Sequence, residues 1–204
     1  MTPVVISISA VILAGGMGRR MGGQDKGLLQ FEGRPLVEHL LEALQQQVET
    51  VFINANRNQS IYARYGYPVL DDPLPDFQGP LAGFSAAMQV ARTTHIMTLP
   101  CDGPWIAPDM ARRLREALQN LPDGIAVAHD GERLQPVHAL IPVTLHPSLQ
   151  AFLASGERKI DRWYRQHTLV PVDFSDVAPL FRNINTPEQQ HTLQQQHRQE
   201  PAKT

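Results

Sequence analysis

The chain has 204 residues, of which 42% are apolar, and a formal net charge of −2 with its eight histidines counted as neutral. The length and the apolar content predict one domain with a real core, and the charge excludes a broad basic surface for nucleic acid. A single cysteine, Cys101, excludes a disulfide framework and favours a reducing cytoplasm. The apolar N-terminal run lacks a cationic start and is too short to cross a bilayer, so we expect a buried strand there rather than a targeting or membrane segment.

Strand and helix patterns alternate along the chain as far as Leu121. Short runs rich in apolar residues predict strands at 9–14, 50–54, 68–70 and 95–99. Apolar residues at helical spacing, together with start signals, predict helices at 35–47, 60–65, 81–91 and 108–120. Alternating elements with buried strands are typical of a parallel sheet that carries helices on both of its faces.

The pattern changes after Leu121. We expect two strands around a turn at Asp130–Gly131, then two short helices and a further strand, at 125–129, 136–141, 148–154, 159–166 and 170–174. A last helix is expected to begin with Asn185 or Thr186 as its N-cap and Pro187 in its first turn. The glutamine-rich end predicts that residues 1–190 form a single domain and that residues 191–204 are a flexible polar tail.

The most informative stretch, LAGGMGRRMGGQDKGLL, runs from Leu13 to Leu29 and follows the first predicted strand. It is not a P-loop, because Gly27 rather than serine or threonine follows Lys26, and it is not a dinucleotide fingerprint, because Met21 stands where the last glycine is needed. Six glycines nevertheless expose main-chain amides, and Arg20, its neighbouring arginine and the lysine add positive charge. We therefore predict an anion site here in preference to a flexible turn with solvated cations.

Polar residues also follow the next two long strands. The carboxyl ends of parallel strands meet at one edge of a sheet, where such folds bind ligands, so we expect the glycine loop, Asn54 and Asp102 to converge. Asp102 would suit Mg²⁺, which takes few protein ligands together with phosphate oxygens; the alternative is that it caps the following turn. The pair Asp71–Asp72 would either cap a turn or bind a ribose or base, and Asn54 would contact a base edge or form an Asx turn.

These residues resemble the signature of the nucleotidyltransferases of the molybdenum cofactor group, in which Leu-x-Gly-Gly-x-x-x-Arg-Met-Gly is followed closely by Lys. Further blocks match in the same order: NAN at 54–56, DD at 71–72, GPLAG at 79–83, PCD at 100–102 and NINTPE at 183–188. The resemblance covers nearly the whole chain and implies an α/β fold of the nucleotidyltransferase type, a Rossmann-like three-layer sandwich with a mostly parallel sheet. The LAGG sequence, where related cytidylyltransferases tend to have LAAG, favours guanine.

The implied reaction is the transfer of GMP from GTP to Mo-molybdopterin, which forms the molybdopterin guanine dinucleotide cofactor and releases pyrophosphate. The resemblance assigns contacts with GTP to seven residues: Leu13, Ala14, Gly15, Lys26, Asn54, Asp72 and Asp102. It makes Asp102 the ligand of Mg²⁺ and gives catalytic roles to Arg20, Lys26 and Asp102. We place Asn183 and Asn185 on the pterin side.

Two other functions stay open on the sequence alone. One is a different nucleotidyltransferase that uses CTP or accepts a sugar or polyol phosphate, because its first loop would look much the same. The other is a non-catalytic module that binds GTP. The resemblance is compatible with transient contact with molybdenum cofactor assembly proteins or molybdoenzymes, and we expect no nucleic-acid or membrane partner in a cytoplasmic setting.

Overall fold

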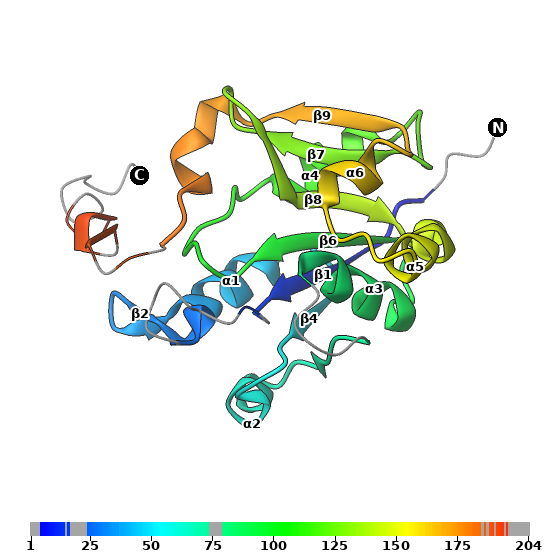
Figure 1. Cartoon of the computed structure of the whole chain (residues 1–204). Coiled ribbons are helices and arrows are strands. Elements are labelled where there is room, and N and C mark those ends of the chain that lie inside the picture. Colours follow the sequence, from blue (N-terminus) through cyan, green and yellow to red (C-terminus); the bar gives the residue numbers. More distant parts are fainter. Residues whose placement is uncertain are drawn as a thin grey trace.

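A computed structural model describes residues 5–14, 16, 24–73, 79–184, 186, 188–189, 191–193 and 195. Its described part is built on a seven-stranded sheet with the strand order β5-β4-β1-β6-β8-β7-β9 (Figure 1). In chain order these strands are β1 (Ile8–Leu13), β4 (Thr50–Asn54), β5 (Val69–Leu70), β6 (His95–Pro100), β7 (Ile125–His129), β8 (Leu134–Pro142) and β9 (Leu169–Asp173). Every strand expected from the sequence is present, with ends that differ by no more than two residues.

The sheet is mostly parallel, as expected. Strands β5, β4, β1 and β6 run parallel, and β9 runs parallel to β7. Strand β8 is antiparallel to both of its neighbours, β6 and β7. It is reversed because the short turn at Asp130–Gly131 joins it to β7, and a short turn can connect only antiparallel strands.

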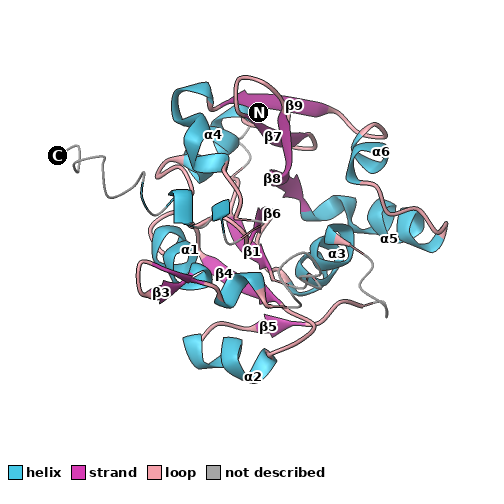
Figure 2. Cartoon of the chain, turned by 60° about the vertical axis from the view of Figure 1, so that its left-hand side comes forward, coloured by secondary structure: helices cyan, strands magenta, loops and turns pink. Residues whose placement is uncertain are grey.

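Helices cover both faces of this sheet and make the three layers (Figure 2). They are α1 (Leu36–Leu44), α2 (Gln59–Tyr62), α3 (Pro80–Val90), α4 (Met110–Ala117), α5 (His146–Ala154) and α6 (Ile160–Tyr164). Side chains of α1 and α4 pack with Ile12 of β1 on one face, and side chains of α3, α5 and α6 pack with Val11 on the other. Consecutive strand residues point to opposite faces, so β1 contributes to both cores. None of the helices described is both long and apolar enough to cross a membrane.

Two features were not predicted. Strands β2 (Gln30–Phe31) and β3 (Arg34–Pro35) form a small hairpin whose two turn residues, Glu32 and Gly33, have φ of 50° and 79°. A 3-10 segment, η5 (Ser175–Phe181), follows β9. Shorter 3-10 turns lie at η2 (Lys26–Leu28), η3 (Ala63–Tyr65) and η4 (Val143–Leu145).

The end of the described chain packs on the β2–β3 hairpin. Gln189 donates its backbone N–H to Thr186 Oγ1 at 3.2 Å, which confirms Thr186 as a helix cap, while Asn185 and Pro187 lie outside the described residues. Leu193 is buried in a small third core with Phe31 and Ile184. The described chain therefore packs against the hairpin as far as Leu193. The division into a domain of residues 1–190 and a flexible polar tail of residues 191–204 stays a prediction.

Candidate functional site

The ends of β1, β4 and β6 are level, so the residues that follow them meet at one edge of the sheet. Leu13 is paired with Asn54 on one side and with Pro100 on the other. Ala14, the next residue, donates its N–H to the carbonyl oxygen of Asn54 at 2.8 Å. The strand ends that carry Asn54 and Asp102 meet as expected from the sequence, while most of the glycine loop lies outside the described residues. Because the Ala14 N–H is already engaged, a main-chain contact from this residue to a nucleotide is left to its carbonyl oxygen.

Lys26 and Asp102 meet at this edge. The Lys26 Nζ lies 3.1 Å from Asp102 Oδ2, and the two side chains are only 24% and 17% exposed. The other carboxylate oxygen, Asp102 Oδ1, is buried and accepts no hydrogen bond within the described part of the chain. Leaving a buried polar atom without a partner costs free energy, and such an atom in a native protein calls for an explanation such as an ion.

The donor set at Asp102 fits a magnesium-like cation better than a metal held wholly by protein. No group of three or more His, Cys, Asp or Glu residues that could hold a metal occurs among the described residues. A cation bound by Asp102 would therefore take its other ligands from phosphate oxygens and water, which is the usual coordination of Mg²⁺ in nucleotide-binding proteins. The neighbouring Cys101 is buried and burial raises the pKa of its thiol, so it is not a reactive nucleophile.

Asp72 is held from two sides. Asn54 Nδ2 donates to Asp72 Oδ1 at 2.9 Å and to the Leu70 carbonyl oxygen at 3.2 Å. Asn56 Nδ2 donates to Asp72 Oδ2 at 2.6 Å, and the Asp72 N–H donates back to Asn56 Oδ1 at 2.9 Å. The Asn54 amide nitrogen is thus engaged within the protein, and one of its two hydrogen bonds holds Asp72. Asp71 points elsewhere and pairs with Gln59 Nε2.

Asn56 was not singled out from the sequence, although it belongs to the NAN block. The available signal was the spacing of two between Asn54 and Asn56 at the end of a strand, which brings both amides to the same side. Three other site residues expected from the sequence, Gly15, Arg20 and Asn185, lie outside the described residues.

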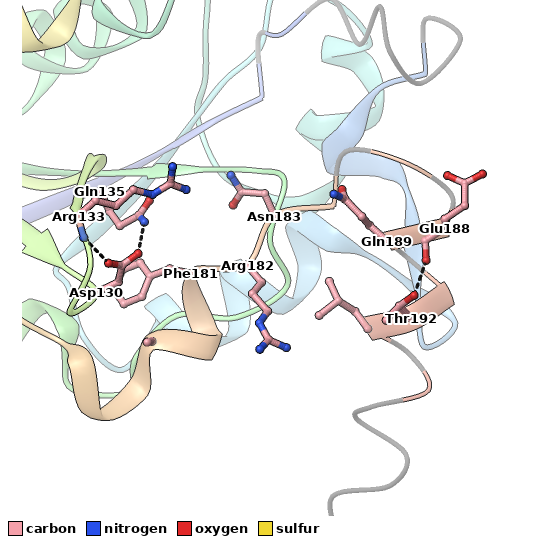
Figure 3. A pocket seen from close by; sticks show the side chains of 11 residues that line it. Asp130, Arg133, Gln135, Phe181, Arg182, Asn183, Glu188, Gln189 and Thr192 are labelled. Atoms are coloured by element: carbon pink, nitrogen blue, oxygen red, sulfur yellow. Dashed lines mark hydrogen bonds between the residues drawn. The ribbon is translucent and has the colours of Figure 1, made fainter.

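A pocket of about 640 Å³ lies between the β7–β8 turn, η5 and the last helix (Figure 3). Most of its lining is polar or charged: Asp130, Arg133, Gln135, Ala178, Phe181, Arg182, Asn183, Glu188, Gln189, Thr192 and Leu193. Apart from Asn183, none of these was expected to form a site. The Asp130 carboxylate accepts hydrogen bonds from the Arg133 N–H at 2.8 Å and from Gln135 Nε2 at 2.6 Å, and the backbone hydrogen bond from Arg133 is the main cause that lowers the pKa of Asp130.

The pocket adjoins Asp102 through the segment 182–184. The N–H of Ile184 donates to the carbonyl oxygen of Asp102 at 2.6 Å. A Cβ added to Gly103 would lie 3.0 Å from the carbonyl oxygen of Arg182 and 3.8 Å from Asn183 Oδ1. Asn183 therefore lies between the pocket and the strand end that carries Asp102, and its role on the pterin side stays a prediction.

A mostly parallel, three-layer α/β fold with charged and polar residues at the carboxyl ends of its strands is typical of open α/β proteins that bind ligands at this edge. Residues 10–171 match the family described as "MobA-like NTP transferase domain". The chain belongs to this family of nucleotidyltransferases, and the resemblance seen in the sequence is confirmed.

Individual proteins agree with this assignment. A protein of Shewanella piezotolerans named molybdenum cofactor guanylyltransferase is 45% identical over 190 residues, which cover 93% of each chain. The solved molybdopterin-guanine dinucleotide biosynthesis protein A from Archaeoglobus fulgidus has a TM-score of 0.79 at 19% identity, over 94% of this chain and 100% of that one. A Mycobacterium tuberculosis protein solved in complex with manganese has a TM-score of 0.64 at 17% identity, over 93% of this chain and 98% of that one. At these identities the two structures show the shared fold alone.

Proposed function

We propose that this protein transfers GMP from GTP to the terminal phosphate of Mo-molybdopterin, which forms the molybdopterin guanine dinucleotide cofactor and releases pyrophosphate. The observation that carries the proposal is the Lys26–Asp102 pair at the strand ends, with one buried carboxylate oxygen still available. The guanylyl donor and the pterin acceptor are supported by the name of the relative that is 45% identical over 93% of the chain. The single cysteine of this protein suits a reducing cytoplasm as the setting of the reaction.

In this reaction an oxygen of the acceptor phosphate attacks the α-phosphorus of GTP, and the bond from that phosphorus to the bridging oxygen of the β-phosphate breaks. The nucleophile is already ionised, so no strong general base is required. The main obstacle is repulsion between two anions, which costs about 4 kcal/mol for like unit charges about 4 Å apart at a surface-like dielectric. Catalysis then consists mainly of alignment and charge neutralisation.

Lys26 would neutralise phosphate charge, since its ammonium group is a mobile point charge already held at this edge by Asp102. Arg20 would add a second cation from the glycine loop. Asp102 Oδ1 would hold Mg²⁺; bound there, the ion would offset the charge of the triphosphate and help to stabilise the in-line transition state. Leu13, Ala14 and Gly15 would lie along the nucleotide through their main chain.

Asp72 would hold the guanosine portion of GTP, supported by Asn54 and Asn56. An ionised carboxylate accepts hydrogen bonds only, and guanosine presents N–H and hydroxyl donors to it. Because two amides already fix both oxygens, Asp72 keeps one orientation and binds its ligand without having to become ordered.

The pterin of the acceptor would enter the pocket beside Asp102, where Asn183 belongs to the lining, and Asn185 stays an expected contact of the pterin. A pterin ring carries donors and acceptors on its edge, and an asparagine amide offers both. The pocket has about 640 Å³, within the range of ordinary small-molecule sites, and the hydrogen bond from Ile184 to the Asp102 carbonyl oxygen supports a position of the acceptor close to Asp102. Transient contact with molybdenum cofactor assembly proteins or molybdoenzymes would supply the acceptor and receive the product.

The decisive experiment incubates the protein with Mo-molybdopterin, Mg²⁺ and each nucleoside triphosphate in turn, and measures pyrophosphate and the dinucleotide product. Guanylyl transfer from GTP alone supports the proposal. CMP transfer, or transfer only to a sugar or polyol phosphate offered in a parallel reaction, would replace it by another nucleotidyltransferase activity. Tight GTP binding without pyrophosphate release for any acceptor would make the protein a GTP-binding module.

A further inference from the structure

A second polar network surrounds Asp25, the residue before Lys26. The Asp25 side chain is only 4% exposed. Its Oδ1 accepts hydrogen bonds from the Tyr62 hydroxyl at 2.6 Å and from the Gly27 N–H at 3.2 Å, and its Oδ2 accepts one from Asn58 Nδ2 at 3.0 Å. We call Asp25, Tyr62 and Asn58 the Asp25 clamp. Hydrogen bonds to a buried, ionised carboxylate are strong, so the clamp fixes the position of Asp25.

The clamp controls where Lys26 points. Through its bond to Gly27, Asp25 caps the 3-10 turn Lys26–Leu28. The turn is closed by the Leu28 N–H, which donates to the Asp25 carbonyl oxygen at 3.1 Å, and by the Leu29 N–H, which donates to the Lys26 carbonyl oxygen at 3.1 Å. From this turn the Lys26 ammonium reaches Asp102 Oδ2 at 3.1 Å. A rotation of the turn would move the ammonium away from the strand end.

Packing leaves the turn little freedom to rotate. A Cβ added to Gly27 would lie 2.5 Å from the Tyr62 hydroxyl oxygen and 3.5 Å from Cys101 Cβ. The backbone of the turn is thus seated between Tyr62 and the residue that precedes Asp102. Glycine at position 27 allows this approach, because any side chain would push the turn away from Tyr62.

Tyr62 contributes a hydrogen-bond donor to the Asp25 clamp in addition to packing in the core. Its side chain is fully buried, a position that phenylalanine would fill without the need to satisfy a hydroxyl group. Burial raises the pKa of Tyr62, so the hydroxyl keeps its proton and remains a donor to Asp25. The Arg57 Nε lies 3.8 Å from Asp25 Oδ2 and offsets the negative charge of the carboxylate.

We propose that Asp25, held by Tyr62 and Asn58, is a positioning residue for phosphoryl transfer that aims Lys26 at Asp102 and at the phosphates of the bound nucleotide. Asp25 itself contacts no substrate in this proposal, and the kinetic part of its test rests on the proposed function. The clamp has a second consequence for the site. Its Tyr62 and Asn58 come from the connection between β4 and β5, which also carries Asn56, so the nucleoside and phosphate ends of the site share one support.

The kinetic test compares Tyr62→Phe with Tyr164→Phe. Tyr164 is a matched control: it is also buried, its hydroxyl donates to the Pro136 carbonyl oxygen at 2.8 Å, and it packs in the core on the opposite face of the sheet. We expect Tyr62→Phe to lower kcat for guanylyl transfer roughly 10-fold and Asp25→Asn roughly 100-fold, with a smaller change in KM for GTP, since a misplacement of about 1 Å can cost about 100-fold in rate. Tyr164→Phe should leave kcat unchanged. A fall in kcat that only follows the folded fraction measured by circular dichroism would overturn the proposal.

A second readout needs no substrate. The chain has only three lysines, Lys26, Lys159 and Lys203, so reductive ¹³C-dimethylation gives a Lys26 NMR signal that Lys26→Arg assigns. Dimethylation keeps the positive charge and one N–H. We expect the Lys26 signal to move toward that of the exposed Lys159 in Tyr62→Phe and Asp25→Asn, and to stay in place in Tyr164→Phe. An unmoved Lys26 signal in both clamp variants refutes the clamp. A moved signal in a protein that transfers no guanylyl group supports the clamp and refutes the proposed function instead.

Discussion

Replacement of Gly83 by alanine is expected to weaken GTP binding while the protein stays folded. Gly83 lies in α3, and a Cβ at this position would lie 2.4 Å from Asn54 Oδ1 and 2.6 Å from Leu13 Cδ2. Ordinary contacts begin near 3.4 Å, so the Asn54 amide would have to move by about 1 Å. A shift of that size breaks the 2.9 Å hydrogen bond through which Asn54 holds Asp72.

Two effects on stability oppose each other in this variant. Alanine is better than glycine in a helix interior by roughly 1 kcal/mol, whereas overpacking a buried site costs roughly 1–3 kcal/mol. The net loss is therefore about 0–2 kcal/mol, which a folded domain tolerates. A hydrogen bond to a charged group contributes about 1.5–3 kcal/mol, so loss of the support for Asp72 predicts a Kd for GTP that rises roughly 10- to 100-fold.

Titration calorimetry with GTP and Mg²⁺ measures the affinity, and thermal unfolding reports the stability of the same samples. Gln89→Ala is the control, because Gln89 lies on the exposed side of the same helix and should leave both quantities nearly unchanged. If folded Gly83→Ala bound GTP as tightly as the wild type, the contribution of Asn54 and Asp72 to nucleotide binding would be refuted.

Four further variants test the site and the core. Asp102→Ala should keep the fold, and its turnover in the guanylyl-transfer assay should fall by about 100-fold or more, as it does when an electrostatic stabiliser is lost. Unchanged turnover with Mg²⁺ would show that Asp102 is not the metal ligand. Lys26→Ala should raise KM for GTP and slow transfer, and kinetics equal to the wild type would contradict its contact with phosphate. Asn56→Ala removes one hydrogen bond that holds Asp72 and should raise the Kd for GTP roughly 10-fold. An unchanged affinity would contradict the contribution of Asn56. Burial lowers the pKa of His138 to about 4, so the unfolded chain, with a histidine pKa near 6.5, binds the extra proton first as pH falls. The stability that depends on neutral His138 is fully present above about pH 6.5 and is lost toward pH 4, by at most roughly 3 kcal/mol. The unfolding free energy of His138→Leu, measured with urea, should therefore fall less than that of the wild type between pH 7.5 and pH 5. Parallel curves for the two proteins would contradict this prediction.

The sheet could be predicted from the sequence because each long strand is a buried apolar run with clear ends. The run His95–Leu99 ends at Pro100, and the run Thr50–Asn54 has a polar residue at each end, so each was located to within a residue. The β2–β3 hairpin was missed because strands of two residues carry no periodicity. The only signal there was the Glu32–Gly33 pair, whose positive φ angles make the tight turn.

The positions of the site residues were predictable, but several of their roles were not. The position of Asn54 and Asp102 at one edge was predicted because residues after parallel strands must meet there. The support that Asn54 gives to Asp72 depends on which way an amide turns, and a sequence does not contain that information. The bond between Asp25 and Tyr62 joins residues 37 positions apart on different elements, and no spacing rule links them.

The connection between β4 and β5 has a consequence for changing the nucleotide that this enzyme accepts. Its start holds Asp72 through Asn56, and its middle holds Asp25 through Asn58 and Tyr62. Under the roles proposed for Asp72 and Asp25, exchange of the whole connection would alter both base preference and the position of the Lys26 ammonium. Redesign of specificity would then keep residues 58 and 62 and vary only the residues around Asp72.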